Sequence, residues 1–331
     1  MTSFFESILN GINNVIGNYG WSVVVFTLLV RLVLLPLDIK SKKSMRAMSK
    51  VQPKMQELQV KYAKDKDKLN QKMSELYKKE HVNPLMGCLP MLIQLPILFI
   101  MFAAMRNIGN QMTGNMLKDV MDKLANCASV DEVGGIGKVA TEGWLWIKNI
   151  FQPDSFGQTI LPSFEGAITA LKTAKIDTAA YEGLAAFYNH YLALNYGSTL
   201  FHTERILFFS VSWPTTFEAL RMFSNGLLIL PVFAGLSQWL MTKITSGTQP
   251  QQPQQPQDPN NPNPMNSGMM KWFFPLFSVY ICITSNAAFA VYWAAANVIA
   301  IVQQVIINWY FERKDKKEAA LAAEQADNDE I

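Results

Sequence analysis

The chain has 331 residues and a mass of 37.3 kDa; half of its residues are hydrophobic and only 17% are charged. Soluble domains carry about 25% charged residues, so this composition excludes an ordinary pair of soluble domains. Three cysteines, Cys88, Cys127 and Cys282, are too few for a disulfide framework. The net charge of +3 conceals an uneven distribution, which indicates where a membrane lies.

Residues 1–18 contain no Lys or Arg, which excludes a secretory signal and a mitochondrial presequence. Apolar side chains recur in this segment at helical spacing: Phe4, Phe5, Ile8, Ile12, Val15 and Ile16. The pattern predicts a short amphipathic helix that lies on the outer membrane surface.

Four windows are nearly free of charge: 19–37, where Arg31 is the single charge, and 84–105, 222–242 and 272–311, which have none. About 20 apolar residues in a helix cross the roughly 30 Å hydrocarbon layer. The last window is long enough for two spans, 272–286 and 287–311, with a turn at the polar cluster Thr284-Ser285-Asn286. The sequence therefore predicts an all-α membrane protein with five transmembrane helices.

The charge balance of the loops predicts orientation. Residues 38–83 hold thirteen Lys+Arg and six Asp+Glu, a net of +7, whereas residues 106–221 hold nine and eleven, a net of −2. Basic loops remain in the cytoplasm. We therefore expect 38–83, 243–271 and the tail 312–331 inside, and the N-terminus and the long loop 106–221 outside, with Ile206–Trp213 at the interface.

Within 38–83, apolar residues step by threes and fours on both sides of Lys64-Asp65-Lys66-Asp67, which predicts a helical hairpin with a charged turn. Pro53 is expected to kink or restart its first helix. The basic residues form either a solvated face or a contact surface for anionic headgroups, RNA or a partner protein. The Pro/Gln/Asn-rich run Thr248–Pro264 is expected to be a flexible linker, and the acidic tail after Lys317 to be disordered.

Arg31 is unfavourable in a membrane span, because the insertion of a charge at mid-bilayer costs about 2.5–3.5 kcal/mol of free energy on insertion scales. One explanation is snorkelling: Asp38, at the predicted inner boundary, is seven residues away, about 10 Å along a helix. The other is a hydrated cavity, open to the cytoplasm, where Arg31 meets an anionic group. No acidic residue lies in any predicted span to pair with it.

Polar side chains on other spans are compatible with such a cavity, although each one is more often a helix–helix hydrogen-bond partner. They are Gln94, Gln238, Asn297, Gln303 and Gln304. The three histidines share no metal spacing, and no nucleophile, phosphate-binding or redox motif occurs. We therefore expect no cofactor, no metal and no enzymatic activity.

Several segments resemble the YidC/Oxa/Alb family of membrane protein insertases, and together they cover residues 19–154 and 225–310. They are TLLVRLVLLPL (27–37), SMRAMSKVQPKMQELQVKY (44–62), LYKKEHVNPLMGCLPMLIQLPI (76–97), WLWIKNIFQPD (144–154), ILPVFAGLSQWL (229–240), KWFFPLF (271–277) and VYWAAANVIAIVQQ (291–304). The form is similar to the short bacterial one, since no large outer domain precedes the first span.

The resemblance implies a five-helix bundle around a hydrophilic groove, open to the cytoplasm and to lipid and closed outside. In that family the arginine matching Arg31 lies in the groove and attracts the hydrophilic, often acidic, segment of an incoming protein; Gln94 and Trp293 match positions that also face it. The implied partners are nascent integral membrane proteins, membrane lipids, the Sec translocon and the ribosome. The implied location is the bacterial plasma membrane.

The sequence departs from the family at an insertion near 155–224 and at the turn Ser285-Asn286-Ala287-Ala288, which lacks the usual Pro and Gly. The tail is less basic than those that hold ribosomes. Two other functions stay open: a transporter that binds an anion at Arg31, and a membrane scaffold that recruits partners through the basic hairpin. The transporter is disfavoured because the spans show no inverted repeat.

Overall fold

The computed structural model describes residues 2–63, 65–83, 86, 89–125, 141–157, 159–177, 184–185, 201–206, 209–214, 224–246 and 268–329. The predicted linker Thr248–Pro264 lies outside them. The chain divides into two compact units. Unit 1 comprises Met1–Thr27, Gln94–Leu236 and Phe273–Ala295; unit 2 comprises Leu28–Ile93, Ser237–Trp272 and Ala296–Ile331.

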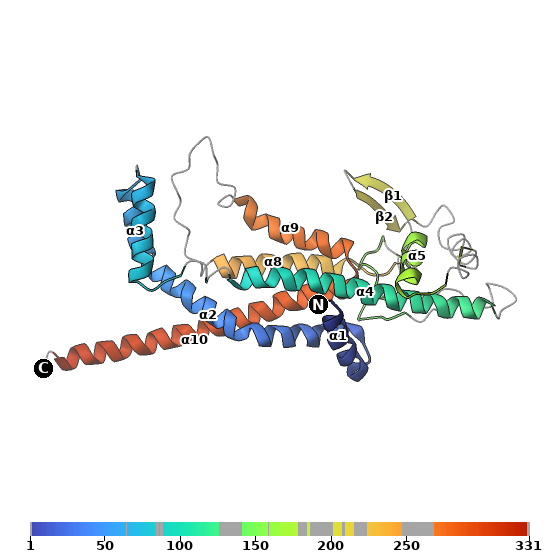
Figure 1. The fold of residues 1–331 in the computed structure, drawn as a ribbon, viewed down its shortest axis with the longest axis horizontal. Helices are drawn as coiled ribbons and strands as arrows, with labels where there is room; N and C mark the ends of the chain where they lie inside the picture. Colours follow the sequence, from blue (N-terminus) through green and yellow to red (C-terminus); the bar gives the residue numbers. More distant parts are fainter. Residues whose placement is uncertain are drawn as a thin grey trace. The chain divides into compact units, whose positions relative to one another are not determined.

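The described residues are predominantly helical, which confirms the predicted helical class (Figure 1). The helices are α1 (Thr2–Ile16), α2 (Tyr19–Lys61), α3 (Lys66–Lys79), α4 (Leu89–Ala125), α5 (Phe164–Thr173), α8 (Ile229–Ser246), α9 (Gly268–Thr284) and α10 (Ala287–Asp329). Within the predicted outer loop, residues 106–221, the structure has an antiparallel hairpin of β1 (Phe201–Ile206) and β2 (Phe209–Pro214), where the sequence predicted only a segment at the interface.

Three helices in the described part of the chain are long and apolar enough to cross a membrane: Tyr19–Lys61, Leu92–Asp122 and Ala287–Leu321. Much of their apolar surface is exposed; Val33 on α2, for example, is 78% exposed. Exposed apolar surface on this scale indicates contact with lipid. The protein is therefore a multi-pass membrane protein. The other two predicted spans, 222–242 and 272–286, coincide with shorter helices: α8, which begins only at Ile229, and α9.

In unit 1, α5 packs against the C-terminal half of α4. Their shared core includes Leu117 and Val120 of α4 and Ala167 and Leu171 of α5, all buried. The helices approach closely at Gly114, where an added Cβ would lie 2.6 Å from the Ala170 carbonyl oxygen. Glycine is required there because any side chain would separate the two helices.

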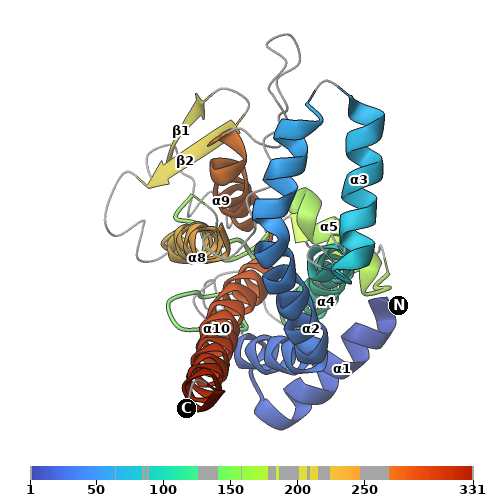
Figure 2. The same cartoon turned by 90° about the vertical axis from the view of Figure 1, so that its left-hand side faces the viewer.

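In unit 2, α2 and α3 form the expected helical hairpin, which Figure 2 shows with the two helices side by side. Its core consists of buried Met48, Val51, Met55 and Val82, with Met73, Leu76 and Tyr77 of α3 packed against them. Asp65 caps α3 by accepting a hydrogen bond from the Lys68 amide at 3.0 Å. The expected restart at Pro53 does not occur, because α2 continues unbroken to Lys61 and packing on α3 offsets the lost backbone bond.

The tail after Lys317 is also not disordered as expected, since α10 continues to Asp329. The run EAALAAEQ (318–325) consists of strong helix formers, and this local propensity outweighs the acidic charge of the tail. An exposed pair, Lys314 Nζ to Glu318 Oε1 at 3.6 Å, adds i, i+4 support.

Candidate substrate-binding residues

Arg31 lies half-buried on the apolar part of α2 in unit 2, next to Leu32 and Val33, which are exposed. Its backbone carbonyl accepts a hydrogen bond from Gln303 Nε2 of α10 at 3.3 Å. Asp38, two helical turns further along α2, interacts electrostatically with its guanidinium. The structure therefore brings together two of the predicted site residues, Arg31 and Gln303, and adds a carboxylate on the same helix.

The polar residues of α8 and α10 in unit 2 form a second contact. Asn297 is buried and its Nδ2 donates to Ser237 Oγ at 3.2 Å, directly beside half-buried Gln238. Gln304 is buried and donates to Asn308 Oδ1 at 3.1 Å. These bonds connect or stiffen helices, which is the ordinary role of amides in membrane bundles.

Gln94 and Trp293 belong to unit 1. Gln94 Nε2 of α4 donates to the Tyr292 hydroxyl of α10 at 3.2 Å. The Trp293 ring contacts Phe289 and Phe277 at centroid distances of 5.9 and 6.5 Å. Its Nε1 is buried and has no partner among the described residues. Buried indole N–H groups are usually hydrogen-bonded, so this donor can serve a carbonyl oxygen supplied from outside the protein.

The sequence did not predict the role of Asp154, a fully buried carboxylate in unit 1. Its Oδ1 accepts from the Leu227 amide at 2.8 Å, and its Oδ2 accepts from the Leu230 amide at 2.7 Å and from Trp146 Nε1 at 3.3 Å. The negative charge thus lies at the N-terminus of α8, where orphan amides and the helix dipole stabilise it. An added Cβ on Gly226 would collide with Asp154 Oδ1, so this position requires glycine.

Asn225 and the segment 149–154 complete a buried polar network. Asn225 Oδ1 accepts from the Asn149 amide at 2.7 Å, and its Nδ2 donates to the carbonyls of Asn149 and Pro153, both at 2.9 Å. The same segment accepts bonds from the first turn of α10, Ala287 N to Gln152 O and Ala288 N to Ile150 O. Nearby, burial lowers the pKa of Lys148. One short segment therefore fixes the starts of both α8 and α10.

The comparison with known proteins decides the family. Residues 11–315, most of the chain, match the family described as 60Kd inner membrane protein. The chain belongs to this family. Curated members similar to it are named Membrane protein insertase YidC, so the resemblance predicted from the sequence is confirmed.

Two relatives illustrate the extent of the similarity to the 60Kd inner membrane protein family. The YidC of Fusobacterium nucleatum is 46% identical over 107 residues, which are 32% of this chain and 52% of that protein. The YidC of Chlorobaculum parvum is 26% identical over 314 residues, 95% of this chain and 37% of the relative. The chain thus spans about half or less of the length of these curated relatives.

Proposed function

We propose that the chain is a membrane protein insertase and chaperone of the bacterial plasma membrane, which acts by binding and not by covalent chemistry. It has five spans, with α8 and α9 as the third and fourth, its N-terminus outside and its C-terminus in the cytoplasm. Support comes from the names of its relatives and from the excess of basic residues in 38–83.

The observation that carries the proposal is the guanidinium of Arg31 in the otherwise apolar N-terminal stretch of α2, residues 19–37. In a hydrated groove, this charge attracts the acidic outer segment of a client and draws it part-way into the bilayer. At an effective dielectric near 20, a carboxylate 4 Å from Arg31 gains about 4 kcal/mol before desolvation. That attraction holds a client segment briefly and still permits its release into lipid.

The remaining residues proposed to contact the client are Gln238, Asn297 and Gln303 in unit 2 and Gln94 and Trp293 in unit 1. Gln303 supports this assignment through its bond to the Arg31 carbonyl, and Trp293 through its buried indole N–H without a partner in the described chain. A client backbone carbonyl would satisfy that donor. The amides would replace part of the water shell of a hydrophilic client segment.

Nascent integral membrane proteins are the proposed clients, and the Sec translocon and the ribosome are the proposed partners. The basic hairpin of α2 and α3 supports cytoplasmic contacts with anionic surfaces, because most of its lysines are exposed.

The test is an insertion assay in reconstituted vesicles with a single-span client that has an acidic outer tail. We expect Arg31→Ala to lower insertion at least tenfold, since about 1.4 kcal/mol of lost attraction suffices for that factor. Arg31→Lys should retain most of it, because the charge is kept. Lys40→Ala removes an exposed cation from the same helix and serves as the matched control.

A client with a neutral tail should insert equally well with the wild-type chain and with the Arg31→Ala variant, which separates charge attraction from misfolding. If the Arg31→Ala variant inserted the acidic client as well as the wild-type chain does, this result would contradict the proposed groove mechanism. Saturable uptake of a small anion by the vesicles would favour a transporter instead. Loss of activity only on charge reversal in the hairpin would favour a scaffold.

A further inference from the structure

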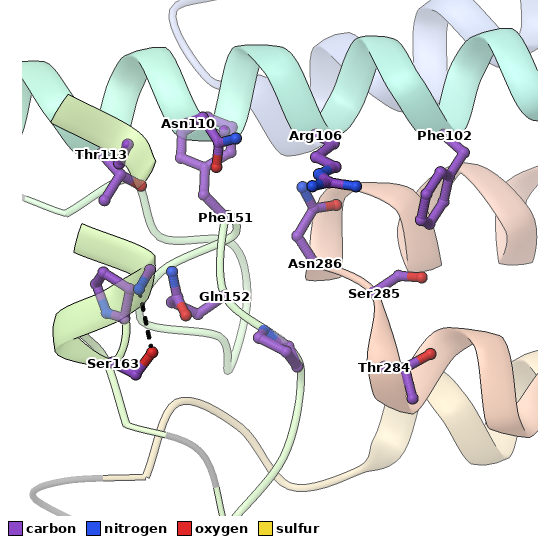
Figure 3. A pocket seen from close by; sticks show the side chains of 15 residues that line it. Phe102, Arg106, Asn110, Thr113, Phe151, Gln152, Ser163, Thr284, Ser285 and Asn286 are labelled. Atoms are coloured by element: carbon purple, nitrogen blue, oxygen red, sulfur yellow. Dashed lines mark hydrogen bonds between the residues drawn. The ribbon is translucent and has the colours of Figure 1, made fainter. Parts of the chain in front are cut away.

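A polar cavity of about 470 Å³ lies within unit 1, and none of the predicted groove residues lines it. Its walls come from α4, the segment 151–153, the start of α5 and the turn between α9 and α10 (Figure 3). Its volume falls in the range of small-ligand pockets, about 300–1,000 Å³. Two of these walls, the segment 151–153 and the turn before α10, are held by hydrogen bonds from Asn225 and from the first turn of α10.

The charge that lines the cavity is positive. Arg106 of α4 lines it, and no carboxylate does so in the part of the chain that the structure describes. Two acidic residues of unit 1 are engaged by other groups: Glu6 accepts a hydrogen bond from Asn107, and Asp154 caps α8. Arg106 itself has no hydrogen-bond or ion-pair partner among the described residues. Arg106 is an exposed residue, and an unpaired guanidinium at a polar hollow favours an anion.

Ser285 is a second, independent observation that points to a ligand. It lines the cavity and is only 5% exposed, and its hydroxyl has no partner among the described residues. The adjacent Thr284 hydroxyl instead bonds the Tyr280 carbonyl at 3.0 Å. Buried hydroxyls without a partner are uncommon and costly, so a ligand atom at this position would satisfy the group.

Neutral donors complete the lining. Figure 3 labels Asn110 and Thr113 on α4 and Gln152 opposite them. The amide side chains of Asn110 and Gln152 have no hydrogen-bond partner in the described chain, whereas Asn286 is already committed, donating to the Met105 carbonyl at 3.0 Å. Free amides beside a guanidinium suit a ligand that carries hydroxyl groups next to its negative charge.

The cavity lies next to exposed apolar faces of α4 and α9, which are suited to contact with lipid. Arg106 directly follows the apolar stretch of α4 and is the first charged residue after it. Exposed apolar side chains lead towards it along α4 and α9: Phe99 is 68% exposed and Ile283 is 38% exposed. A molecule with a charged head in the cavity would lay its acyl chains along these faces, and basic pockets at helix ends are known to hold phospholipid headgroups.

We propose that this cavity binds the phosphate of an anionic phospholipid with a polyol headgroup, of the phosphatidylglycerol type. Arg106 pairs with the phosphate, Ser285 donates to one of its oxygens, and the free amides bind the headgroup hydroxyls. The missing carboxylate disfavours lipids with an ammonium headgroup. The leaflet follows from the proposed orientation, which places the cavity outside; binding itself does not depend on insertase activity.

The experiment titrates the full chain, purified in a neutral detergent, with short-chain phosphatidylglycerol and short-chain phosphatidylcholine and follows binding by calorimetry. We expect phosphatidylglycerol to bind at least tenfold more tightly, and Arg106→Gln to weaken it about tenfold, since a charge-assisted bond of this kind is worth that factor or more. Arg106→Lys should restore most of the affinity. Ser285→Ala should weaken it less, because one neutral bond is lost.

Lys118→Gln is the matched control, because Lys118 is an exposed cation on the same helix that does not line the cavity. Equal affinity of wild type and Arg106→Gln, or no preference between the two lipids, would overturn the proposal. If glycerol 3-phosphate competed for the cavity as well as the lipid does, the occupant would be a soluble phosphate and not a lipid. Because binding is measured without a client, failure here is distinguishable from failure of the Arg31 mechanism.

Discussion

Two regions of the molecule hold distant segments together by opposite means. The Asp154 network, formed by Asn149, Asp154 and Asn225 in unit 1, uses buried polar groups with directed hydrogen bonds. The hairpin core, formed by Met48, Val51, Met55 and Val82 in unit 2, uses apolar side chains without directed bonds.

The two regions are expected to differ in how well they tolerate amino-acid substitutions. A buried carboxylate that accepts two backbone N–H bonds leaves unsatisfied donors if it is replaced by a side chain without two acceptor oxygens. Methionine is flexible and polarisable, and it fills irregular gaps with many side-chain conformations. We therefore expect the Asp154 network to be rigid and brittle, and the hairpin core to adapt to substitution and to partners.

Replacing Asp154 by Ala should have the largest effect. The change leaves the backbone N–H groups of Leu227 and Leu230 at the start of α8 without an acceptor. Each unsatisfied group lowers the free energy of unfolding by about 1–3 kcal/mol. The thermal midpoint of the protein in detergent should fall by several degrees or more, and Asp154→Asn should lose less because one acceptor oxygen remains.

The control is Asp122→Ala, which removes a carboxylate from an exposed ion pair with Lys118 on α4. Pairs of this kind contribute about 0.3–0.5 kcal/mol, so its midpoint should hardly move. Equal midpoints for Asp154→Ala and Asp122→Ala would show that the Asp154 network does not stabilise the fold.

Replacing Met55 by Ala should have an intermediate and local effect. Truncation of a buried methionine costs about 2–5 kcal/mol, whereas Met55→Leu conserves volume and should cost less than about 1.5 kcal/mol. This core stabilises only the hairpin. Hydrogen exchange of the backbone amides should therefore accelerate in α3 and in the α2 residues that face it, and not around Asp154. Uniform acceleration across both regions would refute the separation of the two.

The sequence predicted the hairpin and the helical class because both depend on local information. Apolar residues at three- and four-residue steps mark Met48, Val51 and Met55 as one face of a helix. The polar cluster in the otherwise apolar run from Trp272 likewise falls at Ser285 and Asn286, where α9 and α10 are separated.

The Asp154 network could not be predicted in the same way. Asp154 and Leu230 are 76 residues apart, and no periodicity connects them. The same holds for the cavity at Arg106, whose lining comes from four separate segments. The helical tail differs from the predicted disorder for another reason: in this Ala- and Glu-rich run, helix propensity outweighs the effect of the acidic charge.

The smallest effect is expected at the surface of the hairpin, where Lys54 Nζ lies 2.7 Å from Glu80 Oε1. The hydrogen bond from Lys54 lowers the pKa of the Glu80 carboxyl below its ordinary value. A carboxylate with a lowered pKa in the folded state stabilises that state above its unfolded pKa, and the contribution disappears as pH falls through the folded pKa.

Lys54→Met should therefore raise the pKa of Glu80, measured by carbon NMR of the labelled protein, and shift acid-induced opening of the hairpin to higher pH. Lys50→Met, which removes an exposed lysine of the same helix, should leave the titration of Glu80 unchanged. If both variants titrate alike, the charge around the hairpin acts as a diffuse field, and the pair has no specific role in holding α2 and α3 together.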